Sequence, residues 1–248
     1  MLLTLPQETV NEVIAHLRSD EHTLRALSVA AKRLTDECRR HLFASICIDS
    51  SWKFTRWCDA ISPGEDGLSR YVRTLDLDTP ITWSKGPWLP DPHAVHLRSF
   101  TQVEQLKIRP LDLRGGIGKD LLNCLDPFFP TVRSISIRPT GEYSTILNFL
   151  SLFPRLETTL ITSPSIYENR EVIDPQNFVC RGDLILKVCR IDTRANILSC
   201  LTRPTTCCRS LSLMLVKVEN LAPLERFFET CGSSLESVQL IYCFFGEY

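Results

Sequence analysis

The sequence predicts an α/β protein in which a three-helix head, residues 1–45, precedes a curved solenoid of strand–helix units with parallel strands, residues 46–248. Two observations support this prediction. A short phrase of apolar and polar residues recurs along the body, as internal repeats do in solenoids. Helical spacing of apolar residues fills the gaps between the copies, whereas the first 45 residues lack the phrase.

The head is predicted to begin with a short amphipathic helix. The apolar residues Val10, Val13, Ile14 and Leu17 recur at i, i+3, i+4 and i+7, which is the spacing of one helix face. Pro6 suits the first helical turn, where a missing N–H costs no hydrogen bond. We therefore expect a helix that starts near Pro6 and buries one apolar stripe.

A polar break and a second apolar pattern complete the head. Residues 19–21 form a break that can cap a second helix. Apolar residues then recur at alternating steps of three and four, at Leu24, Leu27, Ala31, Leu34 and Cys38. Domains this small are usually marginal unless they pack on something else, so the head is expected to need a partner.

The order of these residues resembles the F-box, the motif that binds a Skp-family adaptor in cullin–RING ubiquitin ligases. Leu34 departs from the motif, because many F-boxes carry Trp at this position. The positions that match, and that the resemblance implies as adaptor contacts, are Leu5, Pro6, Glu8, Val13, Ile14, Leu17, Leu24, Leu27, Lys32, Leu42 and Phe43. The alternative is a helical cap that only seals the solenoid, since solenoids need terminal caps with a polar outer face.

The body is predicted from one phrase of apolar, two polar, apolar, polar and apolar residues. It occurs at residues 72–77, 132–137 and 208–213, with looser copies starting at 103, 156, 182 and 235. The steps between successive starts are 31, 29, 24, 26, 26 and 27 residues, and an eighth strand fits at residues 44–49. The phrase resembles the L-x-x-L-x-L strand of leucine-rich repeats, whose period is roughly 20–29 residues.

Helical patterns between the strands indicate how the chain returns. Ile146, Leu147 and Leu150 share one helix face, and Leu224 and Phe227 repeat this arrangement later in the chain. Strand–helix units in succession build a parallel sheet, which curves because each strand is narrower than the helix behind it. The last strand phrase, from residue 235, has no capping helix after it. Its edge is expected to be covered by a partner or to continue into further chain.

Two long interruptions, residues 79–96 and 163–179, are predicted as recognition loops. The first holds two tryptophans and four prolines, and loops at one rim of a scaffold often carry recognition. The alternative is that the two tryptophans fold back over the solenoid edge. The residues predicted to contact a target protein, from this loop and from the polar positions of the phrase, are Asp76, Asp78, Trp83, Trp88, Lys107, Arg109, Arg138 and Gln239. They would form a surface that is acidic near the head and basic further along.

Composition argues against several functions. The chain has 28 Lys plus Arg against 29 Asp plus Glu, so no basic excess points to nucleic acid or to an anionic membrane. No run of 18 apolar residues occurs and the start lacks a basic region, so we expect a protein of the cytoplasm or nucleus. The eleven cysteines are odd in number and include no C-x-x-C pair, which favours reduced thiols without a metal site.

Catalytic motifs are weak. Residues 114–120 have the character of a phosphate-binding loop, but Leu113 replaces the first glycine and Asp120 stands where Ser or Thr must bind magnesium. No G-x-S-x-G nucleophile motif is present. The sequence therefore predicts no catalytic residues, no metal and no cofactor, and a nucleotide-binding enzyme using residues 115–119 remains an alternative.

Together the head and the body predict a non-enzymatic substrate receptor. The resemblance implies that the head docks on the Skp-family adaptor, and through it on a cullin–RING ligase, while the body presents an unknown target for ubiquitin transfer. The competing interpretation is a repeat scaffold or inhibitor with no ubiquitin outcome.

Overall fold

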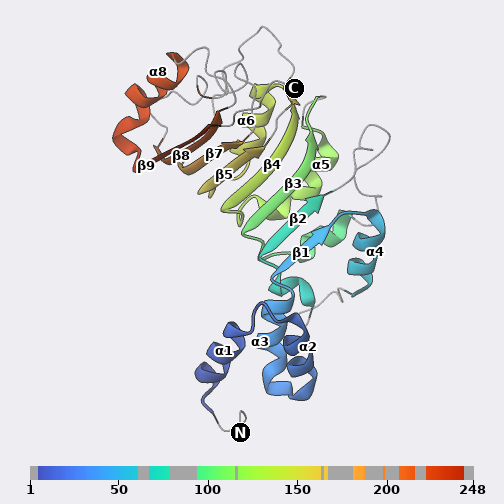
Figure 1. Cartoon of the computed structure of the whole chain (residues 1–248). Coiled ribbons are helices and arrows are strands. Elements are labelled where there is room, and N and C mark those ends of the chain that lie inside the picture. The colour runs from blue at the N-terminus through green and yellow to red at the C-terminus, as the bar shows by residue number, and fades with distance from the viewer. Residues whose placement is uncertain are drawn as a thin grey trace, which may run out of the picture.

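The structure of the chain is a computed structural model (Figure 1). It describes residues 5–60, 67–78, 94–114, 117–162, 165–166, 181–187, 198, 207–215 and 222–242. The loop tryptophans Trp83 and Trp88 lie outside these ranges. Their predicted role in target binding therefore stays a prediction.

The N-terminal head consists of three short helices, α1 (Gln7–His16), α2 (Glu21–Ala30) and α3 (Lys32–Leu42). The predicted start of the first helix is confirmed, because Pro6 stands at its N-cap. Asp20 caps the second helix, as the polar break indicated. Each helix contributes one or two buried apolar side chains to a small cluster that is separate from the core of the body.

Within the described residues, the body is one sheet of nine strands. The strands are β1 (Ser45–Ile48), β2 (Thr74–Asp78), β3 (Gln105–Asp112), β4 (Ser134–Gly141), β5 (Thr158–Thr162), β6 (Ser165–Ile166), β7 (Arg181–Lys187), β8 (Cys207–Leu215) and β9 (Ser237–Tyr242). Eight of them lie side by side in sequence order, and β6 pairs with the end of β4. All pairs are parallel. Each strand must therefore be followed by a connection that returns the chain to the end of the sheet where the strands begin.

The described connections contain helices of two kinds. The α-helices are α4 (Ser51–Ala60), α5 (Lys119–Leu125), α6 (Tyr143–Ser151) and α8 (Ala222–Cys231), and the 3₁₀ turns are η2 (Leu68–Tyr71), η4 (Ala94–Ser99), η5 (Asp126–Phe128) and η6 (Gly232–Ser234). Figure 1 shows α5 and α6 on the same side of the strands. The head lies at one end of the sheet beside β1, and α8 lies at the other end beside β9.

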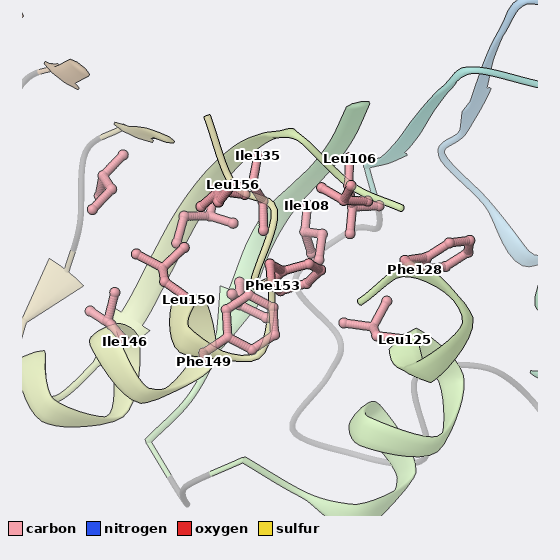
Figure 2. Packing of buried hydrophobic residues seen from close by; sticks show 14 of the residues in the cluster. Leu106, Ile108, Leu125, Phe128, Ile135, Ile146, Phe149, Leu150, Phe153 and Leu156 are labelled. Carbon is pink, nitrogen blue, oxygen red and sulfur yellow. The ribbon is translucent and has the colours of Figure 1, made fainter. Parts of the chain in front are cut away.

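The core of the body lies between the strands and these helices. Leu75, Leu106 and Ile135 occupy the same register position on β2, β3 and β4, and all three are fully buried. Figure 2 shows the side chains of α6, including Phe149, directed toward the strand residues Leu106, Ile108 and Ile135. Burying a large apolar side chain contributes about 1.5–3 kcal/mol, so a continuous layer of this kind is the main stabilising feature of the body.

The strand phrase is confirmed, but the predicted solenoid is wrong. Strands form at every predicted copy and at the eighth position, and the apolar positions of the phrase are buried up to β8 except on β7. There the register shifts after Gly182, so Leu184 and Leu186 are buried and Ile185 is only partly buried. The connections are not equivalent units. The α-helix α4 and the 3₁₀ turn η2 lie between β1 and β2, whereas the described residues between β2 and β3 contain only the 3₁₀ turn η4. The α-helix α6 lies between β4 and β5. The phrase specifies a strand with one buried face and does not specify the return segment. The result is a mixed α/β fold with an open parallel sheet.

The last described strand ends the sheet with exposed apolar side chains. Val238 and Leu240 occupy the core row of β9 but are 45% and 50% exposed, whereas their neighbours on β8, Leu211 and Leu213, are buried. The sheet core therefore thins toward β9 in the part of the chain that the structure describes.

Candidate functional site

The head is held together by a small apolar cluster. Val10 and Ile14 of α1, Leu24 of α2, and Leu34 and Cys38 of α3 are its buried members. Leu34 is thus an internal packing residue of the head. Burial raises the pKa of the Cys38 thiol, which keeps it neutral and apolar in character.

A polar clamp fixes the first helix on the third. The Arg33 guanidinium donates to Gln7 Oε1 at 2.6 Å and to the carbonyl of Leu5 at 2.7 Å. Gln7 in turn donates to Asn11 Oδ1 at 2.7 Å within α1. Hydrogen bonds from a charged donor are among the stronger ones, so this clamp positions the N-terminal turn that carries Pro6. Sequence reasoning missed the role of Arg33, which directly follows Lys32 but is not among the predicted adaptor contacts.

Two further side chains fix the start of the second helix and its corner with the third. Asp20 accepts from the Thr23 backbone N–H at 3.0 Å and from the Thr23 hydroxyl at 2.6 Å. These two bonds hold the pKa of Asp20 below its usual value. Thr35 donates to the carbonyl of Ser28 at 2.7 Å, which ties the end of α2 to the first turn of α3. The three helices are therefore fixed by specific hydrogen bonds as well as by packing.

The eleven predicted adaptor contacts divide into three groups. Ile14 and Leu24 are buried, so they belong to the head's own core. Leu5, Leu17, Leu27 and Leu42 are partly buried against the same cluster, and Phe43 is partly buried with its ring edge-to-face on Trp57 at 6.0 Å. The positions that remain exposed on the head are Pro6, Glu8, Val13 and Lys32. Of these, Val13 is the large apolar one, with 38% of its surface exposed.

A second network joins the head to the sheet. The Tyr71 hydroxyl donates to Asp36 Oδ1 at 2.5 Å, and Arg70 Nη2 donates to the same oxygen at 2.9 Å. The Arg70 guanidinium also lies over the Tyr71 ring, 4.7 Å from its centre. We name Asp36, Arg70 and Tyr71 the junction network. It connects α3 to η2, immediately before β2. No local pattern indicates it, because the partners are more than 30 residues apart in the chain.

The face of the sheet opposite the core carries the described residues of the predicted target set, and we name it the open face. Strand register places Asp76 beside Lys107, and Asp78 beside Arg109, on β2 and β3. Arg109 Nη2 lies 2.7 Å from Asp76 Oδ2 and 3.9 Å from Asp78 Oδ2. The hydrogen bond to Asp76 raises the pKa of Arg109, which keeps the guanidinium charged. These four predicted residues are brought together, and the acidic and basic strands partly neutralise each other.

The other described residues of the predicted target set lie further along the sheet. Arg138 is exposed on β4, and Gln239 is exposed on β9, where its side-chain carbonyl accepts from the Ser212 hydroxyl at 3.2 Å. Arg138 lies on the strand next to β3, one residue after the register pair of Ile137 and Ile108, whereas Gln239 lies on the last described strand, away from the charged group on β2 and β3. Between them, Leu160 of β5 and Ile185 of β7 are register partners and only partly buried. Sequence reasoning missed this apolar pair. Leu160 stands at a polar position of its copy, and Ile185 leaves the core because the register shifts after Gly182.

The glycine-rich segment gives no catalytic arrangement within the described residues. Gly118 is the N-cap of the seven-residue helix α5, and Lys119 is exposed. Gly115 and Gly116 lie outside the described ranges. Among the residues that the structure describes, no three His, Cys, Asp or Glu side chains cluster as a metal site would require. None of the described helices has the length and apolar character needed to cross a membrane.

No protein-family model, curated protein or solved structure matches this chain. The function is therefore argued from the head, the junction network and the open face.

Proposed function

We propose that this chain is a substrate-recognition subunit of a Skp–cullin–F-box-type ubiquitin ligase and that it is not itself an enzyme. The head binds a Skp-family adaptor, and through it a cullin–RING ligase. The open face of the sheet, whose strand phrase resembles that of leucine-rich repeats, binds a target protein. Neither nucleic acid nor membrane is a partner, and the protein acts in the cytoplasm or nucleus.

The observation that carries the proposal is the division of the head into core and surface positions. The motif residues of α1 alternate between the buried Ile14 and the exposed Pro6, Glu8 and Val13. The clamp from Arg33 holds this helix in place without covering Val13, since it acts on Gln7 and on the carbonyl of Leu5. An exposed apolar side chain on a fixed helix is a suitable anchor for a partner groove.

The open face supports the second half of the proposal. It presents charged side chains on β2 and β3 and an apolar pair, Leu160 and Ile185, on β5 and β7. Mixed polar and apolar surfaces of this kind are typical of non-obligate protein interfaces. The loop tryptophans Trp83 and Trp88 are proposed to add contacts at the rim, as aromatic residues often do.

The test is calorimetric titration of the full chain with a purified Skp-family adaptor, using Val13→Asp as the variant. Val13 is already exposed, so the fold should persist while affinity falls by about tenfold or more, which corresponds to about 1.4 kcal/mol. Val29→Asp is the matched control, because Val29 lies on α2, is 86% exposed and is not part of the predicted set. It should bind like the wild-type chain.

Two results would redirect the proposal. If the wild-type chain does not bind the adaptor, the scaffold or inhibitor interpretation replaces the ligase interpretation. If Val13→Asp and Val29→Asp both bind normally, the adaptor uses a surface other than α1.

A further inference from the structure

The head contains a cavity away from α1, and its lining includes Leu42 and Phe43 from the predicted adaptor set. It has a volume of about 300 Å³ and lies between one face of α2, the end of α3 and η2. Residues from all three elements line it, among them Glu21, Arg25, Arg39, Leu42, Phe43 and Leu68. We name it the head cavity. Because α1 contributes none of its lining, it is a separate surface from the one that carries Val13.

The apolar part of the head cavity is preformed. Leu42, Phe43 and Leu68 are each only partly buried, so they offer apolar surface to a ligand. The Phe43 ring is held edge-to-face against Trp57. Leu68 belongs to η2, which the junction network ties to α3 through Tyr71 and Asp36. The cavity therefore does not need to be assembled when a ligand binds, and preformed sites lose less entropy on binding.

The charged part of the head cavity is unbalanced. Arg25 forms an ion pair with Glu21 one helical turn before it, so these two charges compensate each other. Among the residues that the structure describes, no carboxylate or other acceptor pairs with the Arg39 side chain. The next residue, Arg40, instead pairs with Asp36 and Glu37, in each case at 3.5 Å. The Arg39 guanidinium is therefore an uncompensated positive charge next to the apolar lining of the cavity.

We propose that the head cavity is a docking site for a segment of a partner protein that carries an apolar side chain next to a carboxylate. The apolar side chain would contact Leu42, Phe43 and Leu68, and the carboxylate would pair with Arg39. The volume is at the lower limit of ligand sites, which are about 300–1,000 Å³, so it suits one anchoring side chain and its neighbour. Arginine recognises carboxylates with two parallel N–H donors, which gives the site its preference for an acidic segment.

The test is a nuclear magnetic resonance titration of the full chain with its leucine methyl groups labelled. The probes are the blocked dipeptides acetyl-Glu-Leu-amide and acetyl-Gln-Leu-amide, which differ in one charge. The Glu-Leu probe should shift the methyl signals of Leu42 and Leu68, and the Gln-Leu probe should bind at least about tenfold more weakly. Leucine methyls in the sheet core, such as those of Leu106, should not move with either probe.

Charge reversal provides the decisive variant. In Arg39→Glu the Glu-Leu probe should lose its effect, and acetyl-Lys-Leu-amide should instead shift the same two leucines. Arg40→Glu is the matched control, since it makes the same charge change one residue away and outside the cavity lining; it should bind the Glu-Leu probe as the wild-type chain does. A methyl spectrum that is otherwise unchanged in each variant establishes that the fold is intact.

Three results would overturn the inference. The first is an absence of shifts at Leu42 and Leu68 with the Glu-Leu probe. The second is equal binding of the Glu-Leu and Gln-Leu probes. The third is equal loss of binding in Arg39→Glu and Arg40→Glu, which would reduce the effect to overall charge. Since no adaptor is present, none of these results depends on the proposed ligase function.

Discussion

The head and the sheet are stabilised by cores of very different size. In the head, a cluster of five buried side chains holds three helices of 10, 10 and 11 residues. In the body, one continuous cluster runs from Ile46 on β1 to Cys231 at the end of α8. A small core stabilises weakly, which explains why the head adds the Arg33 clamp, the Asp20 cap and the junction network. The sheet relies mainly on buried apolar area.

The largest expected effect comes from the sheet core. Phe149 is fully buried on α6, where Figure 2 shows it among the side chains that face the strands. Phe149→Ala should lower the free energy of unfolding by about 3–5 kcal/mol, because it removes a large side chain and leaves a cavity. Urea denaturation followed by circular dichroism measures this loss.

The corresponding change in the head separates the two regions. Ile14→Ala should cost about 2–5 kcal/mol locally, yet leave the main urea transition of the sheet in place. Limited proteolysis with mass spectrometry should show faster cleavage within residues 5–43 and unchanged cleavage of the strands. If Ile14→Ala and Phe149→Ala instead shift one shared transition equally, the head and the sheet form a single cooperative unit.

An intermediate effect is expected where two strands approach closely. Gly182 on β7 has a φ of +98°, and a Cβ there would lie 2.3 Å from the carbonyl oxygen of Glu157. Gly182→Ala should therefore destabilise the sheet by about 2 kcal/mol or more, because strained backbone and a steric contact add. Gly232→Ala is the matched control, since nothing lies within 4 Å of its Cβ position. Its urea midpoint should stay close to that of the wild-type chain, and equal midpoints for both variants would show that β7 can shift.

The smallest effect concerns the junction between the two regions. Tyr71→Phe removes the hydroxyl that donates to Asp36 and should cost about 1 kcal/mol, the usual net contribution of one hydrogen bond. Thermal unfolding measures it. Asp36 is about half exposed, so solvent screens its charge and Asp36→Asn should cost no more than Tyr71→Phe.

The junction network also predicts a pH window. The hydrogen bond from the Tyr71 hydroxyl is the main cause that holds the pKa of Asp36 below its usual value. The ionised carboxylate therefore contributes its full stabilisation of the fold above the usual pKa of an aspartate. This stabilisation is lost as the pH falls through the lowered pKa of the folded state. Burial, followed by the bond to Asp36, raises the pKa of Tyr71, so its contribution is lost only as the pH rises through that raised value. The stability difference between wild type and Asp36→Asn should be constant from about pH 5 to pH 9 and should shrink in acid. A difference that grows in acid would contradict this assignment.

Local patterns predicted the elements well. The phrase at residues 72–77 placed Leu75 and Leu77 in the core, and the stripe on α6 placed Ile146 and Leu150 there, because burial of one face produces a periodicity that the sequence displays. The solenoid was not predictable in the same way. The strand phrase constrains one buried face and leaves the connections free, and these connections differ from one strand to the next.

The candidate site was predicted in part. The sequence placed Asp76, Lys107 and Arg109 on one face, since alternate residues of neighbouring strands share a side of the sheet. It did not show that Arg109 pairs with Asp76, that Arg33 clamps α1, or that Tyr71 reaches Asp36. These contacts join residues 26 to 35 positions apart, and only the three-dimensional packing brings them together.

We propose that the head binds the adaptor while the open face of the sheet stays free to bind the target protein. Hydrogen–deuterium exchange of the full chain, alone and with a saturating Skp-family adaptor, tests this claim most directly. We predict slower exchange in α1 and the adjoining turn of α3, with unchanged exchange in β2 and β3, which carry Asp76 and Arg109. Slower exchange in β2 and β3 together with unchanged exchange in α1 would contradict the account, because the adaptor would then occupy the face assigned to the target.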